Sequence, residues 1–145
     1  MLSIVTTILI GIVGGLSVGL QGPIAAQMGK RVGGTASSFV VHVSGALLSG
    51  LLLAARGGEQ IGNWRSLSWY MLGSGFFGLV LYLTINRTMP RLGAATALAL
   101  IIIGQLTVGL VVDHFGLFEA AVHPLNAWRM LGVALLLAGG FLVMR

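Results

Sequence analysis

The sequence predicts an all-α membrane protein with five transmembrane helices, and three observations support this fold class. Apolar residues make up 57% of the 145 residues and charged residues only 8%, whereas soluble domains carry about 25% charged residues. The apolar residues form five runs, each close to the ~20 residues with which a helix crosses a bilayer core. Short loops join these runs and leave no room for a soluble domain. The expected spans, within a single domain, cover about residues 2–28, 35–55, 67–85, 92–112 and 127–144.

The net charge and the missing cysteines narrow the function classes. A charge of +5 would indicate nucleic acid binding in a soluble protein. Here the eight Lys and Arg residues lie between apolar runs, as expected of loop charges that set topology, so we expect lipid and not nucleic acid as the partner. Without cysteines the chain has no disulfide and no thiolate metal site. No acid pair or metal-ligand cluster is recognisable either, so we expect no enzyme, no metal and no cofactor.

The loop charges predict how the chain is inserted, because five spans place the termini on opposite sides. One side receives five cationic residues, namely Lys30, Arg31, Arg87, Arg91 and Arg145. The other receives Arg56, Arg65 and Arg129, together with all three acids. The positive-inside rule makes the first side cytoplasmic. We expect the amino terminus outside and the carboxyl terminus inside, although a margin of two charges is also compatible with dual topology.

The first span combines small residues with a proline. Gly11, Gly15 and Gly19 form two overlapping GxxxG motifs, which let another helix approach closely. Pro23 is expected to kink the helix and to free the carbonyl of Gly19. A free carbonyl in lipid must be met by protein or by cavity water. Gln21 is placed either to help at this kink or to face a substrate.

The second span contains the only ionisable side chain well inside any span, His42. Ser38, Gly45 and Ser49 lie close to the same stripe of the helix by their spacing. Ionisable residues inside a membrane are rare and are functional candidates, and histidine titrates nearest to neutral pH. His42 is therefore a candidate for proton coupling; the alternative is a neutral histidine that is hydrogen-bonded to a neighbouring helix.

The third span is rich in small and aromatic residues. Its three glycines, at 73, 75 and 78, indicate tight helix packing. The aromatic Phe76, Phe77 and Tyr82 are packing or interface residues, or they line a cavity. After this span we expect a short turn with Pro90, flanked by two arginines.

The fourth span has one polar side. Gln105, Gly109 and Asp113 stand at i, i+4 and i+8, so they fall on the same side of a helix. An unpaired amide in hydrocarbon costs several kcal/mol, so Gln105 must bond to a neighbouring helix or line a pathway. Asp113, at the membrane edge, is a second candidate for proton coupling, or it pairs with His114, or it is simply solvated. The fifth span is apolar and is expected to pack or to dimerise.

The assembled motifs resemble the YdcZ-like family of the drug/metabolite transporter superfamily. The resemblance covers essentially the whole chain and is carried by PRLGAATALALIIIGQLTVGLVVDHFGLF from Pro90, by Arg129-Met130-Leu131-Gly132, by Gly139-Gly140 and by Gln21-Gly22-Pro23. It implies a five-helix protein of the bacterial inner membrane that moves a small molecule. The superfamily is built from inverted repeats, so a five-span chain is one half of a transporter. The resemblance thus implies a homodimer, possibly antiparallel, or a pair with a homologous sister chain.

One departure from the superfamily concerns coupling. Its four-span multidrug members exchange protons through a glutamate embedded in the first helix, whereas no acid lies inside any span here. His42 or Asp113 would have to take that role, or transport is uncoupled.

The function expected is export of a small organic molecule by alternating access at a dimer interface. Gln21, His42, Ser44 and Gln105 would supply hydrogen bonds to the substrate, and Tyr82 would belong to its apolar wall. A lipid flippase is a variant of this function. The alternative is a non-transporting membrane partner or regulatory subunit, in which the same side chains join helices.

Overall fold

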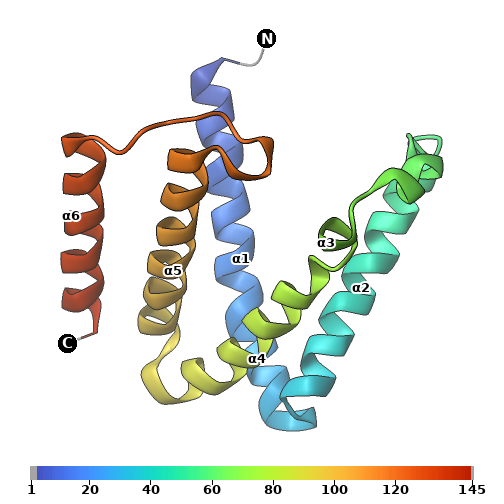
Figure 1. Ribbon diagram of the computed structural model, residues 1–145. Helices are drawn as coiled ribbons and strands as arrows, with labels where there is room; N and C mark the ends of the chain where they lie inside the picture. The colour runs from blue at the N-terminus through green and yellow to red at the C-terminus, as the bar shows by residue number, and fades with distance from the viewer. Residues whose placement is uncertain (1–2, 145) are drawn as a thin grey trace. The chain divides into compact units, whose positions relative to one another are not determined.

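The computed structural model describes residues 3–144, which form helices and loops and no strand (Figure 1). Leu2, at the start of the first expected span, and Arg145, one of the expected cytoplasmic charges, lie outside the described residues. The helices are α1 Ile4–Val32, α2 Gly34–Ala55, η1 Ile61–Ser66, α3 Trp69–Leu72, α4 Gly75–Leu92, α5 Ala94–Phe115, η2 Leu117–Glu119 and α6 Ala127–Val143. The all-helical prediction is therefore confirmed for this part of the chain.

Four helical stretches are long and apolar enough to cross a membrane, namely α1, α2, the α3–α4 stretch Trp69–Leu92, and α5. The fifth, α6, is apolar but has 17 residues. At 1.5 Å per residue it is about 26 Å long, at the lower limit of a span. Large apolar side chains such as Leu20, Leu47 and Leu135 are exposed on these helices, as expected of surfaces that meet lipid.

Some helices end at other residues than expected, because the effect of a proline or a glycine on the helix end was predicted wrongly. The turn expected at Pro90 is wrong, because α4 continues through Pro90 to Leu92. Pro90 gives up one helix bond, from its own nitrogen to the carbonyl of Asn86, but its fixed φ of about −65° is helical, and the helix continues for two more residues. The chain turns instead at Gly93, whose φ of 82° is accessible to glycine. The third span is also interrupted between α3 and α4, and α5 extends beyond Asp113 to Phe115.

Contacts divide the chain into two compact units on either side of the Pro90–Arg91 bond. In the first unit, α1 meets α2 near the turn that joins them. The hydroxyl of Ser37 donates a 2.8 Å hydrogen bond to the carbonyl of Ala25, and both residues are fully buried. Asn86 of α4 lies directly against Gly29 of α1. The end of α1 that follows Pro23 therefore forms these contacts.

The GxxxG glycines of α1 are not used within the described residues. A Cβ placed on Gly11, Gly15 or Gly19 would meet no atom within 4 Å beyond its own helix backbone. Their role in the close approach of another helix therefore remains a prediction.

Candidate functional site

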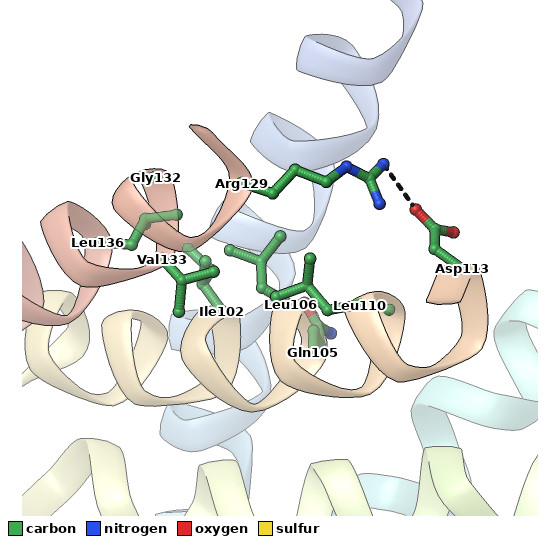
Figure 2. A pocket seen from close by; sticks show the side chains of 10 residues that line it. Ile102, Gln105, Leu106, Leu110, Asp113, Arg129, Gly132, Val133 and Leu136 are labelled. Carbon is green, nitrogen blue, oxygen red and sulfur yellow. Dashed lines mark hydrogen bonds and ion pairs between the residues drawn. The ribbon is translucent and has the colours of Figure 1, made fainter. Parts of the chain in front are cut away.

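The second unit contains a cavity of about 530 Å³ between α5 and α6 (Figure 2). Its size falls in the range of small-molecule sites, which are mostly apolar with a few polar groups. The polar side expected on the fourth span, Gln105, Gly109 and Asp113, lies in its lining. The whole lining consists of Ile102, Gln105, Leu106, Gly109, Leu110, Asp113, Arg129, Gly132, Val133 and Leu136.

Glycines determine where α5 and α6 touch and where they leave room. At Gly140, which is buried, a Cβ would lie 2.8 Å from Cδ1 of Ile103, so the two helices are in close contact there. The cavity lies towards the other end of α6. There, Gly132 of α6 and Gly109 of α5 have no side chains that would fill it. The two helices therefore touch at Gly140, and free space remains between them where the two other glycines lie.

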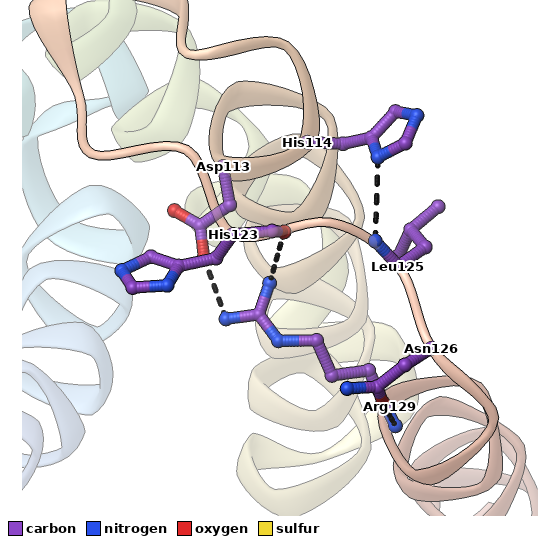
Figure 3. A network of polar contacts seen from close by, with 6 residues as sticks. All are labelled: Asp113, His114, His123, Leu125, Asn126 and Arg129. Atoms are coloured by element: carbon purple, nitrogen blue, oxygen red, sulfur yellow. Dashed lines mark hydrogen bonds and ion pairs between the residues drawn. The ribbon is translucent and has the colours of Figure 1, made fainter.

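An arginine that was expected only as a topology charge lines the cavity beside Asp113 (Figure 2) and makes the polar contacts drawn in Figure 3. Nη2 of Arg129 lies 3.0 Å from Oδ2 of Asp113, and the two side chains are 33% and 36% exposed. Nη1 donates to the carbonyl of His123 at 2.9 Å. The backbone N–H of Arg129 donates to Oδ1 of Asn126, which caps α6. Arg129 therefore joins the end of α5, the following loop and the start of α6.

Of the alternatives for Asp113, the pairing with His114 is wrong. Neighbouring residues of a helix project about 100° apart, so these two side chains cannot face the same point. Asp113 points to Arg129 instead, while Nδ1 of His114 accepts a 3.3 Å hydrogen bond from the N–H of Leu125. A sequence signal for Arg129 did exist, because opposite charges stood at the facing ends of two successive spans.

The two glutamines that were expected to bind substrate are exposed. Within residues 3–144 neither the Gln21 nor the Gln105 side chain makes a hydrogen bond, so Gln21 does not satisfy the carbonyl of Gly19. Ser44 is also exposed, but its hydroxyl donates to the carbonyl of Val41 in its own helix at 3.0 Å. Of these three residues, only Gln105 lies in the α5–α6 cavity.

The first unit brings His42 and Tyr82 together. Nδ1 of His42 lies 2.7 Å from the carbonyl of Ser38, which can only accept, so Nδ1 carries the proton. The ring meets Tyr82 edge-on, with centroids 5.4 Å apart, and Tyr82 is 8% exposed. Nε2 faces Gly78, where an added Cβ would lie 2.7 Å away. His42 is thus held by its own helix and packed against α4, whereas Phe76 and Phe77 are exposed.

Comparison with known protein families identifies the family of the chain. Residues 6–142 match the family described as "Putative inner membrane exporter, YdcZ". No curated protein and no solved structure matches the chain. The match covers nearly every residue and agrees with the apolar helices of a multi-pass inner membrane protein. The chain therefore belongs to the YdcZ family, within the drug/metabolite transporter superfamily.

Proposed function

We propose that the chain exports a small organic molecule and that the substrate occupies the cavity between α5 and α6. The Gln105 amide supports this proposal. It lies on the cavity wall of a helix long and apolar enough to span the membrane, and no side chain in residues 3–144 bonds to it. Because an unpaired amide in hydrocarbon costs several kcal/mol, a partner outside these residues has to satisfy it, and we assign this role to water or a polar substrate.

We further propose that α6 crosses the membrane as a fifth span and that two chains form the transporter. A length of about 26 Å suffices if the bilayer thins slightly at this helix. Transporter sites commonly lie near the midplane where two repeats meet, and alternating access needs two such halves. The unused GxxxG glycines of α1 are suited to contact a second chain, either another copy or a homologous sister chain.

For proton coupling, Asp113 and His42 remain the candidates. Asp113 has the more direct connection to the cavity, because its carboxylate holds Arg129 at the cavity end. Protonation of Asp113 would release Arg129, and this change would reach the cavity without an intermediary.

The test is flux in proteoliposomes that contain the purified chain, with a library of metabolites and organic cations. We expect flux of at least one compound, and loss of this flux in Gln105→Leu while the protein remains folded and assembled. Thr107→Val is the matched control, because Thr107 lies about 200° around α5 from Gln105 and bonds to its own helix at the carbonyl of Ile103.

Two outcomes would contradict the proposal. A folded, assembled protein that moves no compound would not be an exporter of this kind. If Gln105→Leu prevents assembly instead, the amide joins subunits, and the chain is a structural partner.

A further inference from the structure

We propose that the α5–α6 cavity selects an amphiphile of zero net charge whose polar end is a zwitterion. This inference rests on the proposed transport function and names the substrate class for the same cavity. In the bound state, a cationic group of the ligand would lie on Asp113 and an anionic group on Arg129. Its apolar body would lie along Leu106, Leu110 and Val133.

The ion pair keeps free bonding capacity on both partners. A guanidinium has five N–H donors, and Arg129 directs one from Nη1 to His123 and one from Nη2 to Asp113. Asp113 uses Oδ2 for this bond, and within residues 3–144 its Oδ1 accepts no hydrogen bond. Both side chains are about one-third exposed. A ligand with a donor cation and an acceptor anion can therefore bind to both without separating them.

Charge balance excludes ligands with a net charge. The carboxylate of Asp113 and the guanidinium of Arg129 cancel, and the remaining lining is apolar or, at Gln105, an uncharged amide. A net charge that entered this partly desolvated space would have no counter-charge, which is costly. A zwitterion brings no net charge, and each of its ends meets an opposite charge with charge-assisted hydrogen bonds.

The shape of the cavity accounts for the amphiphilic body. Asp113 and Gln105 are eight residues apart on α5, which is about 12 Å along the helix axis. Between them the wall consists of Leu106, Gly109 and Leu110. Charged groups at one end, followed by an apolar chain that carries an uncharged polar atom at the level of Gln105, match this sequence of surfaces.

The experiment measures binding of four probes that share one hexyl side chain. They are 2-aminooctanoic acid, which is a zwitterion, its carboxamide, which is a cation, the N-acetyl acid, which is an anion, and the uncharged N-acetyl carboxamide. Isothermal titration uses the purified full chain in phosphatidylglycerol nanodiscs. We expect the zwitterion to bind about tenfold more tightly than each of the other probes, because one hydrogen bond to a charged group contributes about this much to affinity.

Three variants test which side chains read the charge. Asp113→Asn leaves Arg129 alone and should move the preference to the anion, whereas Arg129→Gln should move it to the cation. The exchange of Asp113→Arg with Arg129→Asp keeps an ion pair, and with it the preference for the zwitterion. This exchange also controls for folding if a single variant unfolds.

The zwitterionic ligand is either a lipid headgroup or a free amphiphile. Repeating the titration in nanodiscs that contain phosphatidylethanolamine distinguishes these two sources. Weaker probe binding there identifies a lipid headgroup as the occupant, and unchanged binding identifies a free amphiphile. Both results support the charge class.

The outcomes that overturn the inference differ from those that overturn transport. Equal affinity for all four probes, or the same order of affinities in both single variants, would overturn it. So would transport of other compounds with no binding of any probe, and in that case the proposed export stands. If no compound of the library is moved, export fails and this inference fails with it.

Discussion

Replacing Gly140 by alanine should destabilise the contact on which the α5–α6 cavity depends, whereas the same change at Gly139 should not. The added Cβ at Gly140 would lie 2.8 Å from Cδ1 of Ile103, while the one at Gly139 would meet nothing within 4 Å. The two glycines are adjacent in α6, so they share helix environment and membrane depth. The comparison therefore isolates the steric contact.

The magnitude follows from two opposing terms. Overpacking by a methyl group costs about 1–3 kcal/mol, and exchanging glycine for alanine inside a helix returns up to about 1 kcal/mol. Gly139→Ala gains only the second term. Gly140→Ala carries both, so it should be less stable than Gly139→Ala by about 1 kcal/mol, the lower end of this range, because the clashing Cδ1 is the end of a flexible side chain and can shift.

The assay is unfolding in mixed micelles with increasing dodecyl sulfate, followed by the helical circular dichroism signal. A second change identifies the clashing atom. Ile103→Val removes Cδ1, so it should restore part of the stability lost in Gly140→Ala, although alone it costs about 0.5–1.5 kcal/mol. Equal stability of the two alanine variants, or a double variant that is merely the sum of the singles, would refute the contact.

Three further predictions concern the remaining contacts. Gly78→Ala should displace His42, because the added Cβ would lie 2.7 Å from Nε2. It should lower the free energy of unfolding by about 1–3 kcal/mol relative to Gly45→Ala, whose Cβ meets nothing within 4 Å. A shifted histidine resonance in NMR spectra checks the displacement, and an unshifted one would contradict it. Ser37→Ala should lower the free energy of unfolding by about 0.6–2 kcal/mol in the same assay, since Ser37 forms a hydrogen bond from α2 to α1. Ser49→Ala should lower it by less, because Ser49 bonds to its own helix. Equal losses would show that the bond to Ala25 adds nothing to stability. Gln105→Leu should abolish flux in proteoliposomes without lowering stability, because the variant removes a polar group without a partner in residues 3–144; a loss of stability would indicate that the amide joins chains.

Periodicity predicted helices and the polar side of α5 because both depend on residues close in sequence. Residues at i, i+4 and i+8 share a helix face wherever the helix lies, and Gln105, Gly109 and Asp113 do line one cavity. The expected turn at Pro90 was wrong, since a proline removes only one helix bond and its fixed φ is compatible with a helix, so the chain can remain helical past it. Gly93 was the stronger stop signal.

The contacts between helices could not be read from the sequence. GxxxG motifs indicate a surface suited to close approach, but not whether this chain or another one uses it. In α1 the contacts fall instead on Ala25 and Gly29. Arg129 was missed because charges near span ends normally serve topology, and only the packing of α6 on α5 shows that this one meets Asp113.

The triple attachment of Arg129 has a mechanical consequence. Its guanidinium bonds to the last turn of α5 and to the loop carbonyl of His123, while its backbone is fixed by Asn126. Separation of the helix ends would break the bonds to Asp113 and His123 together or would drag the loop along, so intermediate openings keep few favourable contacts. Discrete rather than gradual rearrangement is typical of such packed elements, and the Arg129 end of the α5–α6 cavity is accordingly expected to switch between a shut and an open arrangement.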